Sequence, residues 1–173
     1  MEFNILYWIQ NLRSAALDSV MVTVFNNIVG SKGELWVILG ILLLVLPKTR
    51  KTGLCVLSAY IAAYYIGDGI LKDLIARPRP CMLDETVVLL VSRPSSFSCP
   101  SVHSMLAFAA SSSVFWSHRK AGIAAHVFAL LVGFSRMYFF VHFPTDVLLG
   151  SVLGFLIGTA VSFAAKSALQ NSK

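Results

Sequence analysis

Near the end of the chain, the stretch SRMYFFVHFPTDV (135–147) carries an arginine, a histidine and an aspartate in otherwise apolar sequence. Asp146 follows His142 by four residues, with Pro144 between them, and proline is common in the first turn of a helix. A carboxylate placed there can accept a hydrogen bond from one ring nitrogen of His142 and leave the other nitrogen free for nucleophilic attack. Arg136 adds a guanidinium group, which matches the geometry of phosphate oxygens. This stretch therefore predicts a catalytic histidine with an orienting aspartate, next to an anion-binding arginine.

Two earlier stretches offer groups that would complete such a site. The sequence KDLIARPRP supplies the cations Lys72 and Arg79, and CPSVHS opens an apolar run. Within CPSVHS, Ser101 stands at an expected helix start, where free backbone N–H groups and the helix dipole favour an anion. His103 follows it and can serve as the acid. The expected phosphoryl ligands are Lys72, Arg79, Ser101 and Arg136, and the expected catalytic groups are His142, His103 and Asp146.

Each of these residues, taken alone, has a simpler explanation. Lys72 could be a lysine that reaches for the membrane interface, RPRP could be a helix stop, and PSVH could be an ordinary helix cap. His118 and His126 show that a histidine alone indicates little, and we assign them no chemistry. Arg77 and Asp73 are expected at the surface or behind the site. The joint spacing is what favours catalysis.

The composition is that of an integral membrane protein. Hydrophobic residues make up 57% of the 173 residues and charged residues only 13%, against about 25% charged in ordinary globular proteins. The net charge of +6 comes from short basic clusters between apolar runs, a pattern that fits membrane topology better than nucleic-acid binding.

We expect an all-α bundle of six membrane helices that forms one domain over residues 1–173. A spanning helix needs about 20 mostly apolar residues. Segments that reach or approach this length are 34–47, 52–71, 102–117, 121–141 and 145–165. The sixth segment, 3–29, is amphipathic at its start and contains Arg13, Asp18, Asn26 and Asn27, so it is expected to lie partly in the interface before it crosses. Gly150, Gly154 and Gly158 repeat at four-residue spacing, which predicts a stripe for close helix packing.

Alternation of these helices places the three chemistry-bearing stretches on one membrane face. The opposite face receives Lys48, Arg50, Lys51, Arg119, Lys120, Lys166 and Lys173, and the site face receives Lys32, Lys72, Arg77, Arg79, Arg93 and Arg136. Most of the second group gathers around the candidate site, whereas the loops of the first group are short and basic, as cytoplasmic loops tend to be. We therefore expect a multi-pass protein of the cell membrane with its active site on the extracytoplasmic face.

These stretches resemble the signatures of the type 2 phosphatidic acid phosphatases, a superfamily of membrane lipid phosphatases. The family pattern has a lysine before Arg-Pro, then Pro-Ser-Gly-His, and then Ser-Arg followed by a histidine and an aspartate. Here it reads Lys72 to RP at 79–80, PSVH at 100–103, and SR at 135–136 with His142 and Asp146. The one departure is Val102, which stands where the family has glycine. In the family, the glycine lets the backbone approach the phosphate closely.

The resemblance implies a metal-independent phosphoric ester hydrolase without a cofactor. Lys72, Arg79, Ser101 and Arg136 would bind the phosphoryl oxygens. His142 would attack phosphorus to form a phosphohistidine, with Asp146 orienting it and His103 protonating the leaving group. The carboxylates of the sequence are few and scattered and suggest no metal site.

Cys81 and Cys99 flank the loop between the first two signatures. If the site faces outward, an oxidising setting permits a disulfide between them, and two free thiols are the alternative.

The substrate is less constrained than the chemistry. A small chain of this family with an outward site suits hydrolysis of undecaprenyl (polyprenyl) diphosphate. Phosphatidylglycerol phosphate, phosphatidic acid and lipid A are the alternatives. A non-enzymatic transporter or scaffold that binds a phosphate lipid is the alternative of a different class, although a binder has no need of a histidine–aspartate pair.

Overall fold

The computed structural model describes residues 1–170, and this part of the chain contains helices and connecting segments but no strand. The helices are α1 (Glu2–Gln10), α2 (Ala15–Met21), the π-helix η1 (Val22–Ile28), α3 (Glu34–Val45), α4 (Arg50–Ile66), the π-helix η2 (Gly67–Leu71), α5 (Lys72–Ile75), α6 (Pro80–Leu83), α7 (Val102–Ser117), α8 (Arg119–Tyr138) and α9 (Pro144–Gln170). The all-α class is therefore as predicted. Lys173, which was counted on the face opposite the site, lies outside the described residues.

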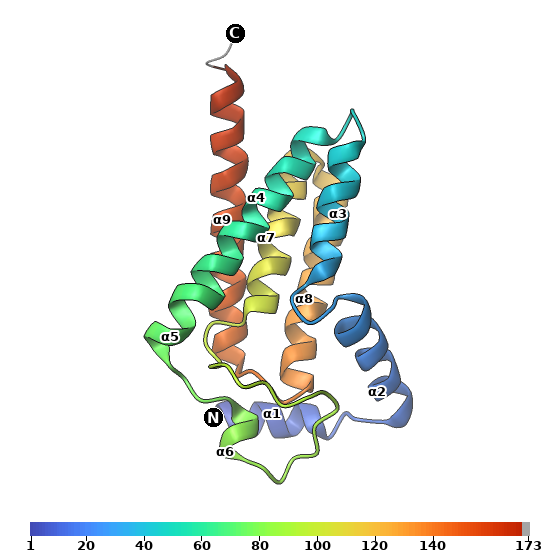
Figure 1. The fold of residues 1–173 in the computed structure, drawn as a ribbon. Coiled ribbons are helices and arrows are strands. Elements are labelled where there is room, and N and C mark those ends of the chain that lie inside the picture. Colours follow the sequence, from blue (N-terminus) through green and yellow to red (C-terminus); the bar gives the residue numbers. More distant parts are fainter. Residues whose placement is uncertain (171–173) are drawn as a thin grey trace.

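Helix α7 is the centre of the bundle, and α4, α8 and α9 pack around it (Figure 1). Small residues fill its sides, and Ala107, Ala109 and Ala110 are completely buried. The buried hydroxyl of Ser113 donates to the carbonyl oxygen of Ala109 at 3.0 Å. A polar helix is tolerated here because its hydroxyls find partners within the protein.

The glycine stripe on α9 fits against the backbone of α7, which confirms the predicted close packing. A Cβ atom added at Gly154 would lie 2.2 Å from the carbonyl oxygen of Met105, and one at Gly150 would lie 2.4 Å from that of Ser101. Only glycine allows the two backbones to approach this far. The first turns of α7 and α9 are held side by side, and the Ser101 amide donates to the carbonyl oxygen of Asp146 at 3.0 Å.

The segment 3–29, which we expected to lie partly in the interface before it crosses, is divided into separate helices, and the count of six membrane helices stays a prediction. Helix α1 lies across one end of the bundle, and α2 and η1 rise beside the bundle from that end (Figure 1). The break is local: Ser14 caps α2 by accepting a hydrogen bond from the Leu17 amide at 3.3 Å. Arg13 also pairs with Asp18 across the break at 3.3 Å. Polar residues in the middle of the segment therefore end one helix and begin another.

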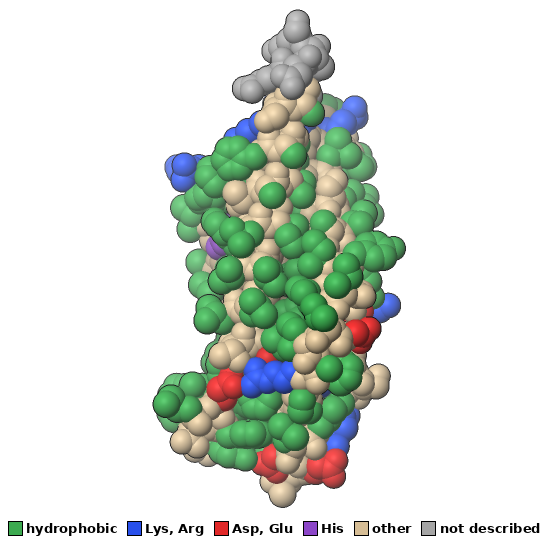
Figure 2. All heavy atoms as spheres, turned by 90° about the vertical axis from the view of Figure 1, so that its left-hand side faces the viewer, with side chains coloured by type: hydrophobic (Ala, Val, Ile, Leu, Met, Phe, Trp, Pro, Cys, Tyr) green, Lys and Arg blue, Asp and Glu red, His purple; other side chains and the backbone are tan. Residues whose placement is uncertain are grey.

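The flanks of the bundle are apolar, as expected for a protein in a bilayer. Within residues 1–170, three helical stretches are long and apolar enough to cross a membrane: Arg50–Leu83, Arg119–Tyr138 and Pro144–Ala168. Large apolar side chains such as those of Ile61, Leu130 and Leu148 point outward. Figure 2 shows them covering the flank between Lys and Arg side chains near one end and charges of both signs near the other. The chain is a multi-pass membrane protein.

Candidate active site

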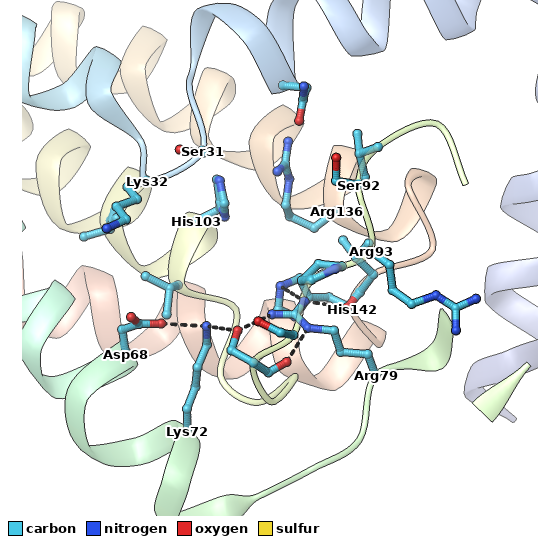
Figure 3. Close-up of a pocket in the computed structure, with 18 of the residues that line it drawn as sticks. Ser31, Lys32, Asp68, Lys72, Arg79, Ser92, Arg93, His103, Arg136 and His142 are labelled. Atoms are coloured by element: carbon cyan, nitrogen blue, oxygen red, sulfur yellow. Dashed lines mark hydrogen bonds and ion pairs between the residues drawn. The ribbon is translucent and has the colours of Figure 1, made fainter. Parts of the chain in front are cut away.

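The three sequence stretches meet at one end of the bundle, although they are far apart in the chain (Figure 1). At this end lie α5, which continues α4 and η2, the start of α7, the end of α8 and the start of α9. A cavity of about 560 Å³ opens here. Five of the predicted site residues line it: Lys72, Arg79, His103, Arg136 and His142 (Figure 3). Ser101 and Asp146 are not among the lining residues and are completely buried.

His142 lies in the connection between α8 and α9, with its ring buried and its two nitrogens facing different groups. Its Nε2 is 3.0 Å from Nη1 of Arg79. Because a guanidinium group only donates hydrogen bonds, Nε2 must accept, and the neutral ring carries its proton on Nδ1. That atom lies 3.8 Å from Oδ2 of Asp146, which is longer than a hydrogen bond, and it has no hydrogen-bond partner among the described residues.

This environment keeps the ring neutral. Burial lowers the pKa of His142 to about 4; the interaction with Asp146 opposes this shift, and the positive charge of Arg79 adds to it. At neutral pH, Nε2 is therefore unprotonated, and its electron pair accepts the hydrogen bond from Arg79 at the cationic wall of the cavity. A neutral imidazole with this tautomer is the state required of a nucleophile.

Asp146 is held on several sides. Its Oδ2 accepts a hydrogen bond from the Phe143 amide at 2.8 Å and another from the hydroxyl of Ser98. Its Oδ1 accepts from Nη1 of Arg77 at 2.7 Å. Arg77 in turn forms an ion pair with Glu2 of α1 at 2.5 Å. Arg77 was expected at the surface or behind the site, and the structure places it behind, where it fixes the carboxylate that faces His142.

Helix α1 also supports the loop that carries His142. The Phe3 ring lies 6.2 Å from Phe140 and 5.2 Å from Phe143, and Tyr7 stacks on Phe140 at 5.9 Å. Phe140 adopts a left-handed backbone conformation with φ 58°, which is unfavourable for a bulky residue. The surrounding rings hold this turn, which reverses the chain and directs His142 into the cavity.

Lys72 and Arg79 share one partner on the cavity wall. Nζ of Lys72 lies 2.7 Å from Asp68 and 3.1 Å from the Ser96 hydroxyl. Arg79 donates to the same hydroxyl at 3.1 Å and to the Ser96 carbonyl at 2.7 Å. The sequence interpretation missed Asp68 and Ser96. Asp68 could have been found from its spacing four residues before Lys72, which pairs side chains on one helix face.

Arg136 and His103 occupy another part of the cavity wall (Figure 3). Arg136 donates to the Phe25 carbonyl oxygen and, through Nε, to the Ser135 hydroxyl at 3.0 Å. Nε2 of His103 is 3.2 Å from the carbonyl oxygen of Gly30. A carbonyl oxygen only accepts, so this nitrogen carries a proton.

Ser101 and Val102 occupy the first turn of α7 differently from what the signature suggests. The Ser101 hydroxyl accepts from Ser104 at 3.0 Å behind the cavity, and its direct contact with phosphate stays a prediction. Val102 lines the cavity, whereas Ser101 does not. The valine side chain, which stands where the family has glycine, therefore narrows the cavity at this point.

The disulfide between Cys81 and Cys99 is not formed in the structure, where Cys55, Cys81 and Cys99 are free and buried. Cys81 belongs to the main hydrophobic cluster at the start of α6. Cys99 lies in a different environment near the charge of Asp146, and burial together with that charge raises the pKa of its thiol to about 11. The two thiols therefore have different surroundings.

The cavity wall suits an anion. Lys72, Arg79 and Arg136 all line it. No group of three or more His, Cys, Asp or Glu side chains that could hold a metal ion occurs within residues 1–170.

Comparisons with known proteins give the class of the protein and then its family. The model of the PAP2 superfamily matches residues 52–168. An undecaprenyl-diphosphatase from Sulfolobus acidocaldarius is 30% identical over 150 residues, which cover 86% of this chain and 69% of that protein. The undecaprenyl-diphosphatase BcrC of Bacillus subtilis is 31% identical over 145 residues, which cover 84% of this chain and 73% of that protein.

A solved structure agrees over nearly the whole chain. The crystal structure of a transmembrane PAP2-type phosphatidylglycerolphosphate phosphatase from Bacillus subtilis superposes with a TM-score of 0.70 and 32% identity. The match covers 98% of this chain and 85% of that one. The chain is therefore a membrane phosphoric ester hydrolase. It belongs to the PAP2 superfamily, as its three signatures predicted.

Proposed function

We propose that this protein is a lipid phosphatase that hydrolyses undecaprenyl (polyprenyl) diphosphate through a phosphohistidine on His142. The observation that carries the proposal is the orientation of the His142 ring. Its Nε2 lone pair faces the cationic cavity beside Arg79, while Nδ1 faces Asp146. A site that only binds phosphate has no need of a buried neutral imidazole backed by a carboxylate.

The proposed reaction proceeds in two displacements at phosphorus. Nε2 of His142 attacks the terminal phosphorus, the bond from phosphorus to the bridging oxygen breaks, and that oxygen takes a proton from His103. Water then attacks the phosphohistidine and gives a proton back to His103, the phosphorus–nitrogen bond breaks, and inorganic phosphate leaves. Lys72, Arg79 and Arg136 stabilise the negative charge on the non-bridging oxygens in both steps, as is typical of phosphoryl transfer. No step requires a metal ion.

The choice of substrate is supported by the similarity to named relatives and not by any contact that the helices make in the structure. Two of them are named undecaprenyl-diphosphatases and match most of this chain. The structural relative named for phosphatidylglycerolphosphate makes that lipid the second candidate. We further propose that residues 1–173 act as one domain and that the cavity opens on the extracytoplasmic face, since the basic turns lie at the opposite end of the bundle.

The proposal is tested by measuring phosphate release in detergent from a polyprenyl diphosphate, phosphatidylglycerol phosphate, phosphatidic acid and lipid A. We expect the diphosphate to give the highest kcat/KM, and a chelator to leave the rate unchanged. His142→Ala should abolish release, because the nucleophile is lost. Lys48→Ala, in the exposed turn before α4, should retain wild-type activity.

Two results would contradict the proposal. Equal activity of the His142 and Lys48 variants would show that His142 is not the nucleophile. Loss of activity with the chelator would contradict a metal-independent reaction.

A further inference from the structure

The loop between η1 and α3 forms the cavity wall beside the proposed general acid. The carbonyl oxygen of Gly30 accepts the hydrogen bond from Nε2 of His103 at 3.2 Å. Ser31 and Lys32 follow directly and line the cavity near His103 (Figure 3). The positive φ angles of Gly30 and Gly33, 85° and 72°, turn the chain sharply on both sides. A substrate group beyond the acid therefore meets this loop.

The backbone of Lys32 is fixed while its side chain is not. Its amide donates to Oε2 of Glu34 at 2.9 Å, and its carbonyl oxygen accepts from the Tyr60 hydroxyl at 2.7 Å. Within residues 1–170, its Nζ makes no hydrogen bond or ion pair. The nearest aromatic face is the ring of Tyr64, whose centroid lies 6.0 Å away. The backbone of Lys32 is therefore held in place, and the three N–H donors of its ammonium group are available to a ligand.

The other cations of the cavity are already engaged. Lys72 is paired with Asp68 at 2.7 Å, and Arg93 with Glu85. Arg79 and Arg136 donate to carbonyl oxygens. Lys32 therefore supplies a positive charge in this cavity wall that forms no ion pair within residues 1–170, although it interacts through space with the carboxylates of Glu34 and Asp68. It lies apart from His142, on the side of His103 (Figure 3).

The geometry of the proposed reaction indicates which part of the substrate would lie near Lys32. In an in-line displacement, the attacking nitrogen and the leaving oxygen lie on opposite sides of phosphorus. The leaving oxygen therefore lies next to His103, and the group attached to it extends toward Lys32. In a diphosphate that group is a second phosphate, whereas in phosphatidic acid it is an uncharged glycerol carbon.

We propose that Lys32 forms a subsite for the leaving phosphate of a lipid diphosphate and selects diphosphates over monophosphates. The inference rests on the proposed function, because it takes His142 as the nucleophile and His103 as the acid. The leaving phosphate gains negative charge as the bridging bond breaks, so the ammonium group stabilises the transition state more than the bound substrate.

The test compares Lys32→Met with the wild-type protein on farnesyl diphosphate, farnesyl monophosphate and phosphatidylglycerol phosphate. Methionine keeps an unbranched apolar side chain and removes the charge. We expect kcat/KM for the diphosphate to fall about tenfold or more, as for loss of a charged hydrogen bond, and that for the monophosphate to change less than about threefold. Lys32→Arg should retain most of the selectivity. Lys120→Met, at the opposite end of the bundle, is the matched control.

Each other outcome is informative. Equal losses on the diphosphate and the monophosphate would overturn the subsite and leave only a general electrostatic effect. A loss confined to phosphatidylglycerol phosphate would also overturn it, because that lipid carries its second phosphate across a glycerol unit. If the wild-type protein cleaves the diphosphate and Lys32→Met keeps the wild-type ratio, the subsite is wrong while the proposed function stands. If the wild-type protein does not cleave diphosphates, the proposed substrate itself fails.

Discussion

At the scale of single residues, the site depends on groups that do not touch the cavity. Arg77 links Asp146 to Glu2, and its guanidinium carbon lies 4.0 Å from the centre of the Phe143 ring. Burial alone would raise the pKa of Glu2, but hydrogen bonds from Thr145 and Arg77 outweigh it and lower that pKa. Glu2 is therefore charged at neutral pH and holds Arg77 in place. Through this chain of contacts, the first residues of the protein position the carboxylate behind the nucleophile.

Replacing Arg77 should lower the rate of the reaction more than the binding of substrate. Arg77→Gln removes a charged hydrogen bond to a buried carboxylate, an interaction worth about 1.5–3 kcal/mol. If Asp146 then orients His142 less well, kcat should fall about ten- to a hundredfold, with KM changed less than about threefold. Arg77→Lys should recover part of the loss because it restores the charge.

The control for this prediction is Arg119→Gln, at the start of α8 on the opposite end of the bundle. A kcat for Arg77→Gln within about twofold of the wild-type value would show that Asp146 needs no support from Arg77. The amount of folded protein is measured by the thermal transition in detergent. If kcat and the amount of folded protein fall together, Arg77 has a structural role only.

At the scale of elements, the distance between α7 and α9 sets the geometry of the site. The two helices carry Ser101 and Asp146 in their first turns, and the backbone hydrogen bond between these residues joins them at 3.0 Å. The glycine stripe of α9 allows this approach along the rest of the interface. A change deep in the membrane can therefore alter the site at the end of the bundle.

Gly154→Ala tests this dependence. Its new methyl group would lie 2.2 Å from the carbonyl oxygen of Met105, so the helices must separate. Overpacking of this kind typically costs about 1–3 kcal/mol, which should lower the melting temperature in detergent and reduce phosphate release. Gly69→Ala is the control, since the nearest atom to its Cβ is Cδ1 of Tyr65 at 3.9 Å. Equal melting temperatures of the two variants would contradict the proposed role of the stripe.

The sequence predicted the elements that follow strong local signals. Gly150, Gly154 and Gly158 could be interpreted because helical periodicity alone puts them on one face. Lys72, Arg79, His103, Arg136 and His142 could be predicted to meet because alternating spans bring their helix ends to one side.

The parts that the sequence did not predict depend on contacts between distant segments. Ser96 meets Lys72 and Arg79 only through the path of the long loop before α7. The position of α1 across the end of the bundle depends on its contacts with Phe140 and Phe143. Whether Cys81 and Cys99 form a disulfide or stay free, as they are in the structure, is not determined by their spacing along the chain.

At the scale of the whole molecule, the two ends of the bundle differ in charge. The carboxylate residues belong to elements and loops at or near the end with the cavity: Glu2, Asp18, Glu34, Asp68, Asp73, Asp84, Glu85 and Asp146. Ion pairs with cations are formed by Glu2, Asp18, Asp68, Glu85 and Asp146. At the opposite end, six basic side chains form no ion pair within residues 1–170: Lys48, Arg50, Lys51, Arg119, Lys120 and Lys166. Uncompensated lysine and arginine in short turns favour the cytoplasmic side, so the cavity should open outside the cytoplasm.

Cysteine labelling in intact cells tests this orientation. Arg93→Cys places a thiol in the exposed loop at the cavity end, and Lys120→Cys places one at the exposed start of α8, at the opposite end. The native thiols of Cys55, Cys81 and Cys99 are buried and should give little background. A maleimide that does not cross membranes should label Arg93→Cys in intact cells and Lys120→Cys only after permeabilisation. The reverse pattern would place the cavity in the cytoplasm, where the enzyme would meet only lipids of the inner leaflet.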